Sequence, residues 1–289
     1  MKSWSPLCCL LALALAGRAD SKVDQNFNGC LGSFYGASPP QGFNQLSGGL
    51  AYICQMYDNF NNPFYASLYS TQLRIPLFSA HVLDFRPGQQ TGNSQTFRVE
   101  PQLVATNLPQ EMLLQTDAEK AIRNNKIPGV PGNLIRQNQS VNADYEGSGY
   151  HKGHLNPDAH HPDGPSQRAT YTLTNVAPMS ASLNSGSWRA SELRTRNIAP
   201  NCTTMYVVTG VIPGNNWIGE NGQQRVRVPS HLWSAYCCRR ANQAPLSGGA
   251  LAQNGINSVQ TYSVAQLQAR LNNLLSPGAN VHIFQNDCQ

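Results

Sequence analysis

Apolar and β-branched runs along this chain predict a sheet-rich protein. Residues 64–69 and 75–83 form two runs of this kind on either side of a turn near Thr71 and Gln72. The run 205–211 is apolar throughout and is typical of a central strand. Weaker runs predict further strands at 169–176, 226–228, 232–238 and 281–284.

Helical periodicity is clearest near the C-terminus. Apolar side chains recur on one face of 264–274, and Ser263 precedes them as an N-cap. Two other helices are expected at 118–124 and from about 183 or 184 to 195, whereas 125–149 and 241–256 look like loops. Strands and helices interleave without a regular βαβ rhythm. The pattern predicts an α+β fold with no convincing linker.

The first 19 residues have the form of a secretory signal peptide. Lys2 gives a positive start, residues 7–15 are apolar, and small residues lie at Gly17 and Ala19. Cleavage after Ala16 or Gly17 is the alternative, and the apolar run is too short for a membrane anchor. We therefore expect a leader at 1–19, one domain at 20–289 and a secreted, extracellular protein.

Cysteine content agrees with export. Cys8 and Cys9 lie in the leader, and six cysteines remain, which read as disulfides with 15 possible complete pairings. No C-x-x-C pair occurs, which disfavours structural zinc. Asn138 and Asn201 begin N-glycosylation sequons. The cysteines expected in disulfides are Cys30, Cys54, Cys202, Cys237, Cys238 and Cys288.

The charge permits a polyanionic partner without indicating one. Without Lys2 and Arg18 the chain keeps 18 basic against 15 acidic residues, a formal charge of +3. Phosphate binding depends on local clusters rather than on so small an excess. Four arginines could follow a nucleic-acid backbone or could simply be solvated: Arg225, Arg227, Arg239 and Arg240.

The segment 150–157, Tyr-His-Lys-Gly-His-Leu-Asn-Pro, carries the strongest chemical signal. Histidine is the side chain best suited to accept a proton from water near neutral pH. Downstream, Asn184, Trp188 and Glu192 are spaced four residues apart and would share one stripe of a helix. Taken alone, this stripe also fits an ordinary polar helix face in which Glu192 pairs with Arg196.

Together these motifs resemble a known family. The series Lys-Gly-His-Leu-x-Pro, Thr-Asn-x-x-Pro and Asn-x-Gly-x-Trp-x-x-x-Glu is similar to that of the non-specific DNA/RNA endonucleases of the ββα-metal class. The flanks 74–80 and 228–238 most resemble its secreted branch, the endonuclease domain-containing 1-like proteins. The resemblance runs from about residue 54 to the C-terminus and implies a ββα-metal fold with a mixed or antiparallel sheet.

The resemblance also implies a role for each matching residue. His154 corresponds to the general base that activates water, and Asn184 to the protein ligand of a hydrated Mg²⁺, which Mn²⁺ could replace. Glu192 corresponds to the carboxylate that orients metal-bound water. Asn175 corresponds to an amide near the base and the scissile phosphate, and Arg196 to a phosphate-binding arginine. The implied substrates are DNA and, secondarily, RNA, bound through backbone phosphates without sequence preference.

One position departs from the family pattern. His151 and Lys152 stand where the family usually has Asp and Arg. Loss of the carboxylate leaves open an impaired descendant that binds nucleic acid or a secreted partner without cleavage. A third interpretation is a His-rich site for Zn²⁺ or Cu²⁺ formed by His151, His154, His160 and His161. Otherwise His160 and His161 are expected to be exposed on a loop.

Overall fold

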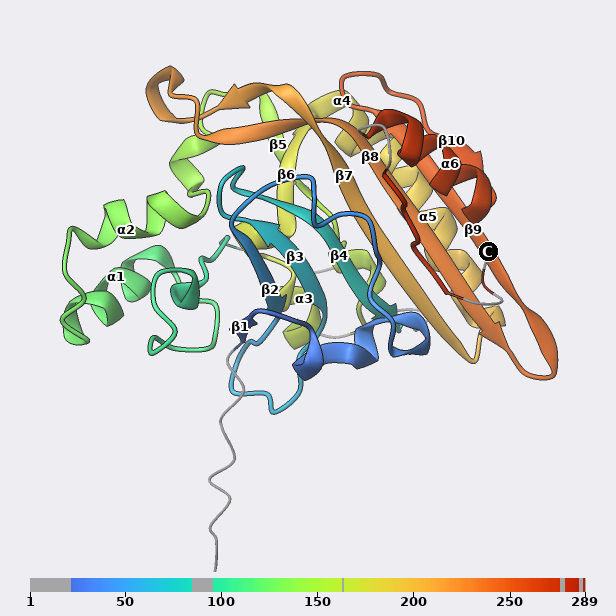
Figure 1. Cartoon of the computed structure of the whole chain (residues 1–289), viewed down its shortest axis with the longest axis horizontal. Coiled ribbons are helices and arrows are strands. Elements are labelled where there is room, and N and C mark those ends of the chain that lie inside the picture. Colours follow the sequence, from blue (N-terminus) through green and yellow to red (C-terminus); the bar gives the residue numbers. More distant parts are fainter. Residues whose placement is uncertain (1–21, 85–95, 163, 276–278, 286–287, 289) are drawn as a thin grey trace, which may run out of the picture.

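An antiparallel sheet of eight strands runs through the molecule (Figure 1). The computed structural model describes residues 22–84, 96–162, 164–275, 279–285 and 288. The strand order is β1-β2-β3-β4-β7-β8-β9-β10. The bounds are β1 Val23–Asp24, β2 Leu50–Cys54, β3 Ala66–Ser70, β4 Ile75–Leu83, β7 Thr204–Ile218, β8 Val226–Arg240, β9 Gln243–Gln253 and β10 Gln260–Tyr262.

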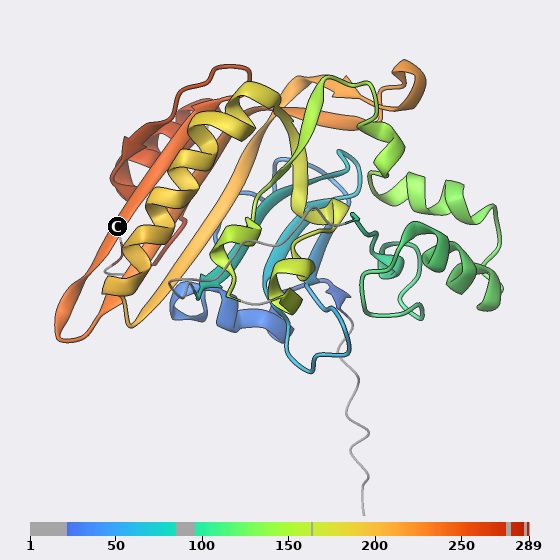
Figure 2. The same ribbon diagram turned by 180° about the vertical axis from the view of Figure 1, so that it is seen from behind.

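Both faces of this sheet are covered. Figures 1 and 2 show α5 (Arg189–Ile198) and α6 (Val264–Leu274) on opposite faces of its C-terminal half. On one face the core gathers Phe78, Trp233 and Leu267, and on the other a second core includes Trp188 and Leu232. The sheet is therefore the middle layer of one folded unit, and the expected α+β class is confirmed.

A second, two-stranded sheet lies on the face that carries α5. It pairs β5 (Tyr150–His154) with β6 (Val176–Ser180) in antiparallel register. The remaining helices are α1 Gln115–Asn124, α2 Pro131–Asn138, α3 Gly164–Ala169 and α4 Ala181–Leu183, with a π-helical turn η7 at Asn184–Trp188. Short 3₁₀ turns are η1 Asn28–Ser33, η2 Tyr35–Ala37, η3 Pro101–Leu103, η4 Asn142–Asp144, η5 Asp158–His160, η6 Leu173–Asn175, η8 Ala199–Asn201 and η9 Glu220–Gly222.

Four local predictions are wrong. The run 169–176 ends α3 and forms η6, and its strand starts only at Val176. Residues 281–284 contribute an isolated bridge between His282 and Gln41 instead of a strand. The expected loop 241–256 holds the long strand β9, and 125–149 holds α2. Pro131 begins α2, where a missing N–H costs nothing.

All six cysteines expected in disulfides are paired, and the structure selects the connectivity. The bridges are Cys30–Cys54, Cys202–Cys238 and Cys237–Cys288. Successive side chains of a strand point to opposite faces, so the adjacent cysteines of β8 reach partners on different sides of the sheet. One of these bridges ties the C-terminal residues to the central sheet.

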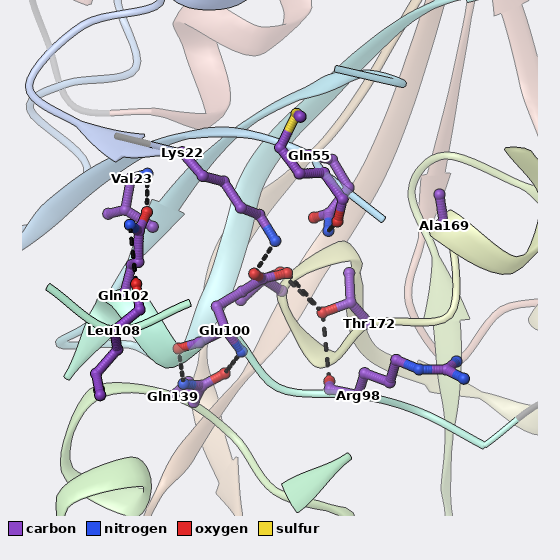
Figure 3. Close-up of polar contacts among 12 residues, drawn as sticks. Lys22, Val23, Gln55, Arg98, Glu100, Gln102, Leu108, Gln139, Ala169 and Thr172 are labelled. Carbon is purple, nitrogen blue, oxygen red and sulfur yellow. Dashed lines mark hydrogen bonds and ion pairs between the residues drawn. The ribbon is translucent and has the colours of Figure 1, made fainter. Parts of the chain in front are cut away.

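A buried ion pair fastens the N-terminal strand to the interior (Figure 3). Lys22 pairs with Glu100, and both side chains are fully buried. The other carboxylate oxygen of Glu100 accepts a hydrogen bond from Thr172 over 3.0 Å. Gln139 brackets the backbone of Glu100 with two bonds of 2.8 Å. The pair thereby links the start of β1 to the segment that leads into β6.

The expected leader at 1–19 lies outside the described residues. Within the described part of the chain, no helix combines the length and apolar character needed to cross a bilayer.

Candidate active site

The motif residues meet where β5, β6 and the following helix adjoin. His154 lies opposite Val176 in the β5–β6 register, and the chain leaves β6 directly into α4, η7 and α5. At Gly153 an added Cβ would lie 2.6 Å from the side chain of Met179 on β6. Glycine therefore permits the close strand approach that sets the position of His154.

An open cavity of about 620 Å³ lies beside this strand pair. His154, His151 and Asn184 all line it, so residues 33 positions apart in sequence share one space. Lys152 lines it too, with its ammonium 5.3 Å from the ring centre of Phe97 and 5.4 Å from that of Tyr145. The other lining residues are Glu146, Tyr150 and Tyr171.

His154 lies between two aromatic rings. Its ring centre is 5.4 Å from that of Phe97 and 4.9 Å from that of Tyr171. Burial lowers the pKa of His154 to about 4, although the charge of Asp158 opposes that shift. Its Nε2 is buried and has no hydrogen-bond partner among the described residues. The imidazole is thus neutral at neutral pH and has a nitrogen that no described protein group engages.

Asp158 is a further residue of the site, and it was not among the residues predicted from the motifs. It begins η5, four positions after His154, and its Oδ2 accepts a 2.8 Å hydrogen bond from the Tyr171 hydroxyl. Its charge raises the pKa of both His154 and Glu192. One carboxylate therefore acts on two predicted catalytic groups. Proximity to His154 in the chain is the signal that could have identified it.

Asn184 occupies the first position of the π-helical turn. Its Nδ2 donates to Nδ1 of His151 over 3.3 Å. The turn is irregular at Gly186, where an added Cβ would meet the Asn257 side chain at 2.5 Å. Asn257 accepts the Ser187 N–H over 2.8 Å. The wide turn, supported from outside by Asn257, directs Asn184 toward β5.

Glu192 is half-buried on α5, two turns beyond Asn184. Burial, followed by the charge of Asp158, raises the pKa of Glu192 to about 8, while Trp188 and Arg189 oppose the rise. Its carbonyl oxygen lies 3.1 Å from Nε2 of His160. Glu192 adjoins the site electrostatically, but it is absent from the cavity wall.

Asn175 is fully buried, and its amide is used inside the fold. Its Oδ1 accepts from the Ser79 hydroxyl and the Asn156 N–H, both over 3.0 Å. Its Nδ2 donates to the carbonyls of Asn156 (2.9 Å) and Thr170 (3.0 Å). This geometry holds the chain just after His154 and leaves no amide group facing the cavity. A direct contact with phosphate is therefore not what the structure presents.

Arg196 lies one turn beyond Glu192 and is also absent from the cavity wall. It is half-exposed, and its charge contributes to the lowered pKa of His160. Of the four arginines that could follow a nucleic-acid backbone or be solvated, Arg225 bonds Asp144 over 2.7 Å and Arg240 donates to the Ala244 carbonyl. Those two are engaged by the protein itself.

The expectation that His160 and His161 lie exposed is wrong. Both are buried: His160 Nδ1 is 3.0 Å from Nε2 of His81, and His161 Nε2 is 2.8 Å from Oδ1 of Asn156. Across the described ranges no cluster of three or more His, Cys, Asp or Glu side chains is arranged to hold a metal. The structure therefore does not support a zinc site formed by these four histidines, His151, His154, His160 and His161.

The cavity residues fit a hydrated divalent cation. Asn184 offers one neutral oxygen donor at the wall, which suits a small cation that keeps most of its water. His154 lines the same pocket, and its Nε2 has no hydrogen-bond partner among the described residues, which suits proton transfer. Two strands and a crossing helix that carry this His and Asn define the ββα-metal class of nucleases.

Comparison with known proteins agrees with that class. Residues 55–282 match the family model described as DNA/RNA non-specific endonuclease. This chain belongs to that family. It is 31% identical to the Endonuclease domain-containing 1 protein of Homo sapiens over 297 residues, covering 99% of this chain and 53% of that protein.

Other relatives are matched over shorter stretches. The Mus musculus Endonuclease domain-containing 1 protein is 31% identical over 81% of this chain and 44% of its own length. Endonuclease G, mitochondrial, of Homo sapiens is 35% identical over 107 residues, 33% of this chain and 35% of that protein. A crystal structure of the EndoG/EndoGI complex aligns at a TM-score of 0.49, with 17% identity, 80% of this chain and 90% of that one. The chain thus spans about half the length of the endonuclease domain-containing 1 proteins.

Proposed function

We propose that this protein is a secreted, metal-dependent endonuclease that hydrolyses phosphodiester bonds of DNA and, secondarily, RNA with little sequence preference. The observation that carries the proposal is that His154, whose buried Nε2 has no hydrogen-bond partner among the described residues, lines the cavity that Asn184 also lines. Family membership supports it, as do the titratable side chains that line the cavity. The implied leader and the three disulfides support secretion.

In this proposal His154 takes a proton from the attacking water. The water oxygen forms a new bond to phosphorus while the bond to the leaving nucleotide oxygen breaks. Asp158 stabilises the imidazolium that forms, as its effect on the pKa of His154 indicates. Asn184 would hold Mg²⁺, or Mn²⁺ in its place, which supplies charge neutralisation at the phosphate.

The remaining groups bind and orient. Lys152 brings an ammonium to the cavity wall and suits a phosphate oxygen, as a point charge in place of a forked arginine. Glu192 orients water from α5, and Arg196 neutralises phosphate beyond the cavity. Asn175 keeps His154 in position through the backbone of Asn156. Contacts to the phosphate backbone of the nucleic acid carry no information about the base sequence.

The test is degradation of plasmid DNA by purified protein with Mg²⁺. Activity should disappear with EDTA and fall by at least about a thousandfold in His154→Ala, because a general base and its positioned water are lost together. His231→Ala is the matched control, since His231 is half-buried on β8 outside the cavity. Unchanged cleavage in His154→Ala would refute the assignment of the base.

His151 favours a second candidate, a nuclease-like protein that binds nucleic acid or a secreted partner without cutting. The observation behind it is the hydrogen bond that ties Asn184 to an imidazole. No cleavage with Mg²⁺ or Mn²⁺, combined with retained DNA binding in a filter or anisotropy assay, would establish that candidate and exclude the first.

A further inference from the structure

His151 and Asn184 set two potential metal donors side by side at the cavity wall. Nδ1 of His151 lies 3.3 Å from the side-chain amide nitrogen of Asn184. His151 is exposed and Asn184 half-buried, so solvent reaches the pair. The amide donates its hydrogen to Nδ1, so the lone pair of Nδ1 points at the amide.

The spacing suits two ligands of a single cation. Two donor atoms that each lie about 2.1 Å from a shared metal are about 3.0–3.4 Å apart when the donor–metal–donor angle is about 90–110°. Half a turn about the last torsion of Asn184 places Oδ1 where Nδ2 lies, without moving the backbone. The hydrogen bond of the metal-free pair would then be exchanged for two bonds to the cation.

The donor type bears on which cation is held. Imidazole nitrogen suits later divalent metals such as Fe²⁺, Ni²⁺ and Zn²⁺ best, and it binds Mn²⁺ more weakly, whereas Mg²⁺ prefers oxygen ligands and water. A carboxylate in place of His151, as the family usually has, would favour the harder ion. Glu146 adds a carboxylate to the same cavity, and two protein donors leave room for water on the cation.

We propose that His151 is a direct metal ligand through Nδ1, which together with Asn184 forms a mixed nitrogen–oxygen site that prefers Mn²⁺ or a later divalent metal to Mg²⁺. This inference rests on the proposed function, because it concerns the cation of the same site. In this view, His151 in place of the family's usual Asp changes which metal the site prefers and does not abolish the site.

The test uses Mn²⁺ as the probe on the intact, disulfide-bonded protein. Pulsed electron paramagnetic resonance of bound Mn²⁺ should show ¹⁴N coupling from one imidazole. That coupling should vanish in His151→Ala and persist in His154→Ala. Calorimetry should show that His151→Ala weakens Mn²⁺ binding on the order of tenfold and leaves Mg²⁺ binding within about twofold. His151→Asp should shift the preference toward Mg²⁺.

The matched control is His282→Gln, a histidine on the C-terminal bridge to Gln41, which should leave both measurements unchanged. Bound Mn²⁺ without nitrogen coupling, in a protein that still cuts DNA, would overturn this inference alone. Coupling that disappears with His154 instead of His151 would overturn it too. Nitrogen coupling in a protein that cuts no DNA with any cation would contradict the proposed function alone.

Discussion

Tyr171 donates its phenolic hydrogen to Oδ2 of Asp158 over 2.8 Å, and its ring packs edge-on against His154. The contact joins the aromatic wall of the cavity to the carboxylate that influences both His154 and Glu192. The position of Asp158 therefore influences the pKa of both His154 and Glu192.

Asp158→Asn should lower the pKa of His154 and of Glu192, since the negative charge raises both. The side-chain oxygen of Asn can still accept from Tyr171. The acid limb of the rate profile should move to lower pH, and the neutral-pH rate should fall by about ten- to a hundredfold because the imidazolium loses its counter-charge. Rate measurements from pH 4 to 9 check this. Asp117→Asn on α1 is the control.

Stability should decline as the pH falls from about 6.5 toward 4. Burial lowers the pKa of His160 to about 4 and that of His81 well below its ordinary value. Both are neutral in the folded protein but protonate at about 6.5 when unfolded, so the unfolded state takes up more protons in this window. For each such group, the free energy of unfolding falls by up to about 1.4 kcal/mol per pH unit.

Urea unfolding at pH 7.5, 6.0 and 5.0 measures that decline. His160→Gln should reduce the pH slope because it removes one of the titrating groups, even if it lowers stability at every pH. A slope identical to that of the parent protein would contradict the role given to His160.

Gly153→Ala should destabilise the protein by about 1–3 kcal/mol, because the new methyl group would lie 2.6 Å from Met179 and push the strands apart. His154 is the next residue, so activity should fall along with stability. Gly32→Ala is the matched control, since nothing lies within 4 Å of its added methyl group. Thermal unfolding of both variants decides whether the close approach matters.

Lys22→Met should cost about 3–5 kcal/mol, since it leaves Glu100 buried without its counter-charge. The double variant Lys22→Met with Glu100→Gln should recover much of that loss, because the amide oxygen still accepts from Thr172. Denaturant titration of the single and double variants gives the coupling. Equal stabilities of the two would show that Glu100 does not need the counter-charge of Lys22.

Prediction of the fold succeeded where local signals agreed. The helix 264–274 has a cap and an apolar face, and it appears as α6 with Ser263 accepting from Gln266. The strand β9 was missed because its Gly- and Ser-rich sequence has little strand propensity of its own, and pairing with β8 and β10 stabilises it. Residues 169–176 alternate like a strand, but Ala169 ends α3, residues 173–175 form the turn η6, and only Val176 lies in a strand.

The sequence by itself determined the family, the six cysteines that pair, and the choice of His154 as candidate base and Asn184 as candidate metal ligand. These depend on residue types at short spacings, which the chain order preserves. Only the tertiary structure decided the disulfide partners, the burial of Asn175, the contact of His151 with Asn184 and the place of Asp158. Such relationships depend on distances across strands and on loss of solvent, and neither is encoded in any local pattern of residues.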